Sequence, residues 1–427
     1  MVYPTSMDRY KRHTTNRCLG WVGALCAAAL LSAPDLSGAQ QRFTLTNPLP
    51  WTRPAADIVI PRGAIELPEG ETVTALHISH LAFENAFPFQ LDDLDGDGEW
   101  DELYSQILIH GEQTLDLVLE TGLPDEAPNF NRRTHAMADA AASPNVTKPA
   151  WESEVMTYVA YGAAQVDAIG KIAPQLSIDF LYQEPTHSQH GFTVQHGQDF
   201  MSVSNTMGAH APFVLEPDGT IVRPWSTDAY VVKGPLANDA VHRSRVVAEG
   251  PLRVIVETRI DEWRSELGDY ACTIRYSIAA NQRHSRVSVI YDKMPLTEPA
   301  PVIGAGVRAF KEDAYLQETG DRVVVASRNV LERTLLVPWM GRAIVASDDL
   351  PAQPIRIPDG AAPVEISGSG PNYGLLFPDA GNAAEYAFIA SWSLDDTITS
   401  WPQYQRKIDR LQEELSFPVI VATWAVE

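Results

Sequence analysis

Four of the chain's eleven histidines lie in one stretch, Tyr182–Phe213, at His187, His190, His196 and His210. Glycines and small polar residues surround them, and the lack of a sustained apolar period predicts a loop, a short strand and a second loop. Grouped imidazoles favour proton transfer and metal binding near neutral pH. We therefore interpret this stretch as the catalytic centre, with His187, His190 and His210 as candidate acids and bases. The alternative for any one of them is a surface histidine that hydrogen-bonds the backbone.

The same stretch offers ligands for a transition metal, since Asp199 follows the first three histidines, but their spacing matches no standard zinc frame. The sequence contains no Walker loop, no dinucleotide-binding glycine motif, no Gly-x-Ser-x-Gly elbow and no HExxH motif. Nucleotide-driven and serine-esterase reactions are therefore disfavoured. Glycosidase chemistry stays open because it needs only two carboxylates, which an acidic sequence supplies.

The composition is that of a large acidic globular protein. The 427 residues are 45% hydrophobic and 20% charged, with a formal net charge of -23. This length favours a large core with at least one smaller unit. The charge disfavours nonspecific binding to nucleic acid or to an anionic membrane. A small anionic ligand is still compatible with it, provided that cationic residues are concentrated locally.

The first 39 residues are typical of an export signal. Basic residues from Arg9 to Arg17 precede the apolar run Cys18–Ala33, and Ser37–Ala39 supplies the small residues of a cleavage site. We expect a periplasmic or secreted protein that has no membrane association after cleavage; a retained anchor is the alternative. Cleavage would leave Cys272 as the one cysteine, so no intrachain disulfide is expected.

Residues 40–123 are predicted to form a small β-domain, because β-type runs alternate there with turn residues. The predicted strands are Asp57–Ile60, Thr72–Ile78, Leu103–Ile109 and Thr114–Leu119.

Within this domain, Asp92–Glu102 alternates aspartates with glycines and resembles the first half of a calcium loop. Tyr104 stands where an EF-hand has its bidentate glutamate, and no flanking helices are predicted, so a solvated Asp-Gly hairpin is the alternative. No cofactor is expected to be required for catalysis. We expect a structural calcium held by four aspartates, Asp93, Asp95, Asp97 and Asp101.

Residues 124–150 are predicted to be a linker, being rich in Pro, Asn, Ala and Ser, and residues 151–427 form a larger unit.

Alternation in Leu252–Asp261, Cys272–Ile278 and Val287–Tyr291 predicts three consecutive antiparallel strands. Their polar face is either a solvated outer face with charge pairs or the wall of a groove. That face would carry four arginines, Arg253, Arg259, Arg275 and Arg286. Further strands are predicted at 322–326, 334–337, 343–346, 373–377 and 387–391, followed by one helix near 401–415, with a Ser400/Gln403 capping box, and a last strand at 418–425.

Several short motifs resemble, in order along the chain, a family of secreted bacterial proteins, the domain-of-unknown-function family forty-eight sixty-one. The resemblance implies a galactose-mutarotase-like fold. The expected fold class is therefore mainly β, with a large antiparallel β-supersandwich, the small amino-terminal β-domain and one late helix. His196 and His210 depart from the family pattern, which has an aromatic residue and a glycine there. The motifs are Trp151–Glu154 with Tyr158, Asp167–Lys171, His190, Gly197–Asp199, Asn205–Ala209 and Gly250–Arg253, with the Asp95–Gly98 hairpin.

The resemblance also implies the dehydration of a uronic acid at the non-reducing end of ulvan-type oligosaccharides. The leading hypothesis is an exported carbon–oxygen lyase that acts by β-elimination on an acidic oligosaccharide and leaves a 4,5-unsaturated uronate. Such a reaction needs a base, an acid and a cationic group that holds the carboxylate. The residues expected to bind substrate are Lys171, Arg243, Arg245, Arg253 and Trp225.

Two alternatives belong to other functional classes. A non-catalytic carbohydrate-binding or mutarotase-like protein would use a groove lined by aromatic residues, such as Trp225, Trp339 and Trp392, and would tolerate substitution of the histidines. A glycoside hydrolase is the third choice, and it would release saturated products.

Overall fold

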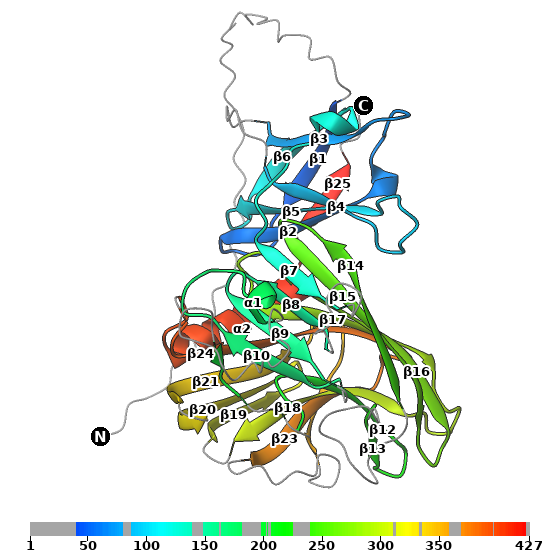
Figure 1. Cartoon of the computed structure of the whole chain (residues 1–427), viewed down its shortest axis with the longest axis vertical. Coiled ribbons are helices and arrows are strands. Elements are labelled where there is room, and N and C mark those ends of the chain that lie inside the picture. Colours follow the sequence, from blue (N-terminus) through cyan, green and yellow to red (C-terminus); the bar gives the residue numbers. More distant parts are fainter. Residues whose placement is uncertain are drawn as a thin grey trace, which may run out of the picture. The chain divides into compact units, whose positions relative to one another are not determined.

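A computed structural model describes residues 40–79, 87–138, 148–161, 164–181, 198–201, 203, 206–224, 240–310, 313–332, 335–357, 369–395 and 397–423. Within these ranges the regular secondary structure is almost all antiparallel strand, which confirms the predicted mainly β class (Figure 1). The predicted export signal lies outside them. Among the described residues, no helix is long and apolar enough to cross a membrane.

The small unit consists of two sheets that enclose their own core. The core contains Phe43, Ile58, Leu76 and Leu103, all at most 1% exposed. The strands predicted at 57–60, 72–78, 103–109 and 114–119 are all present. One sheet has the order β25 (Ile420–Thr423), β1 (Gln40–Thr46), β6 (Thr114–Gly122) and β3 (Thr72–Ile78), and the other β2 (Arg53–Pro61), β5 (Glu102–Ile109) and β4 (Phe89–Asp92).

The larger unit is organised around an eight-stranded sheet. Its order is β14 (Val241–Glu249), β15 (Arg253–Arg264), β16 (Asp269–Ala279), β17 (His284–Lys293), β24 (Ala383–Trp392), β21 (Leu335–Val345), β20 (Arg322–Glu332) and β19 (Asp313–Thr319). β15, β16 and β17 are the three strands that alternation predicted. In β16 every second residue from Tyr270 to Ile278 is buried, because successive side chains of a strand point to opposite faces.

Two five-stranded sheets pack against this large sheet around a shared core. One has the order β11 (Gln198–Asp199), β10 (Val166–Gly170), β9 (Met156–Ala160), β8 (Ala150–Ser153) and β7 (Thr134–Met137), so β7 lies inside the stretch predicted to be a linker. The other has the order β13 (Ile221–Val222), β12 (Ala211–Leu215), β18 (Val302–Phe310), β23 (Ser369–Phe377) and β22 (Gln353–Ile357). The described helices are α1 (Ile178–Leu181) and α2 (Trp401–Ser416), with 3-10 turns at Arg62–Ala64 and Pro124–Glu126.

Helix α2 is the predicted late helix, and it covers the outer face of the large sheet. It buries Tyr404, Ile408 and Leu411 in a core cluster with residues of β20, β21 and β24. The predicted capping box does not form in its usual way. The Ser400 hydroxyl donates to the Gln403 side chain at 2.8 Å instead of accepting from the helix backbone.

Candidate functional site

The histidine-bearing stretch is described only in part. His187 and His190 lie outside the described residues, as does Trp225. Its described portion includes β11, with Asp199, and His210, and helix α1 lies just before the stretch.

Both ends of this stretch are attached to the same five-stranded sheet. The backbone N–H groups of Ser177 and Ile178 donate to Oε1 of Glu152, on β8, at 2.7 and 2.8 Å. After the histidines, β11 pairs with β10, and Gln198 lies opposite Gly170. The sheet therefore fixes where the histidine-bearing stretch leaves and rejoins the fold.

Lys171 takes part in that attachment. Its side chain is 1% exposed, and Nζ donates to the Glu152 carboxylate and to the carbonyls of Ser153 and Gln175, both at 2.7 Å. All three N–H donors of the ammonium are thus engaged. The structure places Lys171 in a buried ion pair, and not on a surface where a substrate carboxylate could reach it.

His210 is fully buried in the core of the larger unit. One ring nitrogen, Nε2, lies 2.7 Å from the Tyr386 hydroxyl, and the ring stacks on Phe388 with centroids 4.9 Å apart. Nδ1 has no hydrogen-bond partner among the described residues. Burial lowers the pKa of His210 to about 3, so the imidazole is neutral at physiological pH.

Two of the arginines expected to bind substrate form exposed ion pairs on the large sheet. Arg243, with its side chain 66% exposed, donates to Asp261 at 2.7 Å, and Arg245, 46% exposed, donates to Glu257 at 2.8 Å. Arg245 lies directly opposite its partner Glu257 on β15, whereas Arg243 lies opposite Arg259, two residues from its partner Asp261. Neither is brought near the histidine-bearing stretch by a described contact.

The third, Arg253, fastens the small unit to the larger one. It donates to the carboxylates of Asp92 and Glu102 and lies over the Tyr104 ring at 4.2 Å. From the same face of the large sheet, Arg286 donates to a carboxylate of the small unit. The predicted arginine face is therefore an outer face with charge pairs, which the small unit covers in part.

A group of fully buried arginines was not predicted. Arg223, Arg308 and Arg342 are each at most 1% exposed, and we call them the buried arginine cluster. Arg223 Nη2 donates to the Thr206 carbonyl at 3.0 Å, and Arg342 Nε donates to the Arg308 carbonyl at 3.0 Å. In the sequence each arginine stands singly beside apolar strand residues, which is also the pattern of an exposed arginine on a half-buried strand.

Two members of the cluster, Arg223 and Arg308, contact the turn at Thr206 to Gly208 in the histidine-bearing stretch. The backbone N–H of Arg308 donates to the Gly208 carbonyl at 2.8 Å, so Thr206 and Gly208 are both held by the arginine residues. Gly208 has a φ of +60°, and a Cβ there would lie 2.4 Å from the Val166 carbonyl oxygen, so only glycine fits. Burial lowers the pKa of Arg223 to about 9. Because this value is still above neutral pH, the guanidinium remains largely charged.

Three of the four predicted calcium ligands come together. Asp93, Asp95 and Asp101 each bring a ligand oxygen within 4.8 Å of the others, whereas Asp97 is not part of this group. Asp93 accepts from the backbone N–H groups of Gly96 and Gly98 at 2.6 and 2.9 Å, which lowers the pKa of its exposed carboxyl. Carboxylates in a tight loop suit a hard cation such as Ca²⁺.

His135 forms a second imidazole site that sequence reasoning missed. Its Nδ1 bonds the Glu249 carboxylate and its Nε2 lies 2.9 Å from Asp179 Oδ1, on α1. Burial alone would lower the pKa of His135, but the hydrogen bonds and charges of the two carboxylates together raise it. His135 therefore ties α1, just before the histidine-bearing stretch, to β14.

Comparisons with known proteins identify a family but no characterised relative. No curated protein matches the chain. Among solved structures, an alpha-mannosidase from Enterococcus faecalis V583 aligns with a TM-score of 0.44 and 8% identity over 91% of this chain and 46% of that one. A protein of glycosyl hydrolase family 38 from Enterococcus faecalis aligns with a TM-score of 0.44 and 9% identity over 90% and 47%. The chain thus spans just under half the length of either structure. The model of a domain of unknown function, DUF4861, matches residues 45–421, and the chain therefore belongs to that family, as its short motifs predicted.

Proposed function

We propose that the protein is a carbohydrate-active enzyme, an exported lyase that dehydrates a uronic acid at the end of an acidic oligosaccharide by β-elimination. The observation that carries the proposal is the match to the DUF4861 family over residues 45–421, because the resemblance to that family implies this reaction. In a chain with a net charge of -23, an anionic substrate requires a cationic side chain that it can reach.

The reaction needs three groups in addition to substrate binding. A base removes the C5 proton, and the negative charge that develops spreads into the carboxylate, where a cation stabilises it. The C4–O bond then breaks, and an acid protonates the departing oxygen. For a terminal 4-hydroxyl the products are water and the 4,5-unsaturated uronate.

The residues of this chain fit those roles by type. His187 and His190 supply the base and the acid, with the two roles unassigned between them, and a cationic side chain that the substrate can reach holds the carboxylate. His210 is neutral because of its burial, as a base must be, and its Nδ1 lacks a partner among the described residues. We keep it as a third candidate, with the Tyr386 hydroxyl as its hydrogen-bond partner.

The test is an ultraviolet assay of purified protein against a panel of uronate-ended oligosaccharides and matched neutral oligosaccharides. We expect the absorbance of a conjugated carbon–carbon double bond to appear with the acidic panel alone, with the loss of one water in the product mass. A saturated product would instead identify a glycoside hydrolase. No product with any acidic substrate would contradict the proposal.

A double variant and a control variant test whether these two histidines take part in turnover. The His187→Ala/His190→Ala double variant should lose turnover by about 10²-fold or more, the usual contribution of one acid or base, and should still bind the oligosaccharide. The control is His110→Ala, an exposed histidine that bonds Thr52 in the small unit and should leave turnover unchanged. Unchanged turnover in the double variant would favour a non-catalytic carbohydrate-binding protein.

A further inference from the structure

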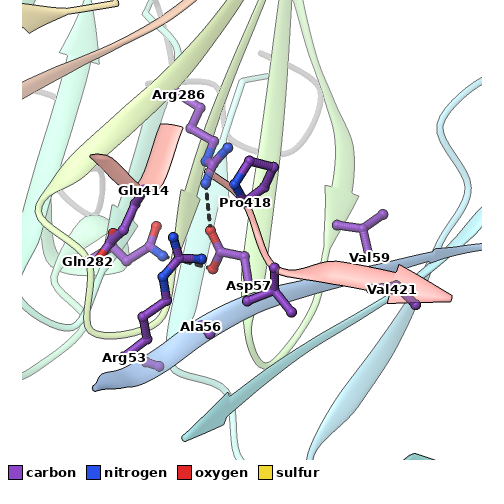
Figure 2. Close-up of a pocket in the computed structure, with 11 residues that line it drawn as sticks. Arg53, Ala56, Asp57, Val59, Gln282, Arg286, Glu414, Pro418 and Val421 are labelled. Carbon is purple, nitrogen blue, oxygen red and sulfur yellow. Dashed lines mark hydrogen bonds and ion pairs between the residues drawn. The ribbon is translucent and has the colours of Figure 1, made fainter. Parts of the chain in front are cut away.

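A cavity of about 150 Å³ lies between strands β2 and β25, strand β17 and helix α2 (Figure 2). Its polar lining comes from Arg53 and Asp57 on β2, Gln282 just before β17, Arg286 on β17 and Glu414 on α2. None of its lining residues belongs to the buried arginine cluster, which lies in and beside β13, β18 and β21. The proposed reaction uses none of these side chains.

Asp57 is the hydrogen-bonding centre of the cavity and is already satisfied. Oδ1 accepts from the Tyr104 hydroxyl at 2.6 Å and from Gln282 Nε2 at 2.8 Å, and Oδ2 accepts from Arg286 Nη2 at 3.0 Å. Burial opposes ionisation, but Arg286 and the Tyr104 hydroxyl keep the pKa of Asp57 below its usual value. A ligand in the cavity is therefore not needed to satisfy this carboxylate.

The arginines, in contrast, have N–H groups left over. Arg53 is 4% exposed, its Nη2 donates to the Phe417 carbonyl, and its Nε has no partner among the described residues. For Arg286, whose side chain is 43% exposed, the described structure gives one hydrogen bond, to Asp57. In Figure 2 the guanidinium groups of Arg286 and Arg53 both lie next to the Asp57 carboxylate, one above it and one beside it. An excess of donors in a cavity calls for an acceptor.

A buried histidine, His284, lies close to Arg286 in the chain but is not one of the residues that line the cavity. His284 is 1% exposed, and neither of its ring nitrogens has a partner among the described residues. It stands two residues before Arg286 on β17, so both side chains lie on one face of the strand. Buried polar groups normally have partners, so two unpaired ring nitrogens here suggest a missing one.

We propose that this cavity binds a small oxyanion, a carboxylate, sulfate or phosphate group, held by Arg53 and Arg286. Guanidinium groups match the geometry of such anions, and two of them approach one space from different elements. Asp57 accepts from four donors, of which Arg286 alone is charged, and the half-buried Glu414 adds a negative charge to the lining that opposes the anion. The site would be a binding site separate from the proposed reaction centre.

The test is calorimetric titration of the full chain with sodium sulfate, sodium phosphate and sodium acetate at constant ionic strength. We expect saturable binding of one ion per chain for at least one of the three, and the strongest ligand identifies the class. Arg286→Gln should weaken that binding tenfold or more. Glu414→Gln should tighten it several-fold, because it removes the like charge.

Arg243→Gln is the matched control. Arg243 also forms one exposed ion pair, with Asp261, but lies outside the cavity, so its loss should leave anion binding unchanged. Thermal melts of each variant verify that it is folded. The proposal is overturned if no anion binds saturably, if Arg286→Gln binds as the parent does, or if Glu414→Gln weakens binding. None of these results depends on the lyase assay.

Discussion

Replacing Lys171 by methionine should lower the free energy of unfolding and leave the affinity for substrate unchanged. The change keeps most of the side-chain volume but removes a buried ammonium that makes three hydrogen bonds. Its partner Glu152 is fully buried and would be left as an uncompensated charge. Breaking a buried pair by removing one partner costs about 3–5 kcal/mol.

The structure favours the lower part of that range. Glu152 would keep other donors, namely the Thr157 hydroxyl at 2.7 Å, the Ser177 hydroxyl at 3.0 Å and the backbone N–H groups of Ser177 and Ile178. We therefore expect a loss of about 3 kcal/mol, a large share of a typical stability of about 5–15 kcal/mol. Adding Glu152→Gln should restore more than half of it, because a neutral amide oxygen still accepts from Ser177 and Ile178.

The assay is urea denaturation followed by tryptophan fluorescence, with the unfolding free energy taken from the midpoint and slope. Lys293→Met is the control, since Lys293 is 59% exposed in its pair with Asp269, and such pairs contribute about 0–1 kcal/mol. A Lys171→Met loss below about 1 kcal/mol would refute the reasoning, as would a double variant no more stable than the single one. A stable Lys171→Met protein with weakened substrate binding would return Lys171 to the substrate site.

The carboxylates around His135 raise its folded pKa, so its contribution to stability is full below the unfolded pKa of about 6.5 and is lost as pH rises through the folded value. The stability gap between the parent and His135→Gln, measured by denaturation at several pH values, should shrink toward alkaline pH; a gap that widens would contradict this. His210 has the opposite sign: its folded pKa of about 3 means that stability falls as pH drops from about 6.5 toward 3, and His210→Gln should flatten that slope in the same measurements. We propose that calcium binds the aspartate loop, so millimolar calcium should raise the melting temperature of the parent and not of Asp93→Asn, while turnover persists in chelator. Asp218→Asn, at an exposed turn that bonds Thr220, is the control and should respond to calcium as the parent does.

Strands that are buried on one face could be predicted from the sequence. In β16 the alternation of buried and half-buried residues follows from the two-residue period of a strand, and the predicted Cys272–Ile278 lies within it. Two strands buried on both faces, β8 and β9, were not predicted. All residues of Ala150–Ser153 and Met156–Ala160 are buried, so these segments have no period to detect.

The ion-pair partners of charged side chains could not be predicted from the sequence, for a different reason. Alternation correctly placed Arg253 and Arg286 on one polar face, but it could not say which carboxylates would meet them. Those carboxylates, Asp92 and Asp57, come from the other unit, far away along the chain. Likewise Lys171 looks like a candidate cation until Glu152 is placed beside it. Charged residues acquire their roles from such contacts, and local spacing does not contain them.

The pairing of β25 with β1 has a consequence for how the protein is made. Phe43 lies opposite Thr423, so the first described strand needs the last one as its neighbour. During synthesis β1 leaves the ribosome early and must wait with one edge open until almost all of the chain has been translated. An open strand edge is a template for pairing with another chain. The nascent protein thus carries an aggregation-prone edge for most of its synthesis, and a chaperone that covers such edges should improve the yield of folded protein.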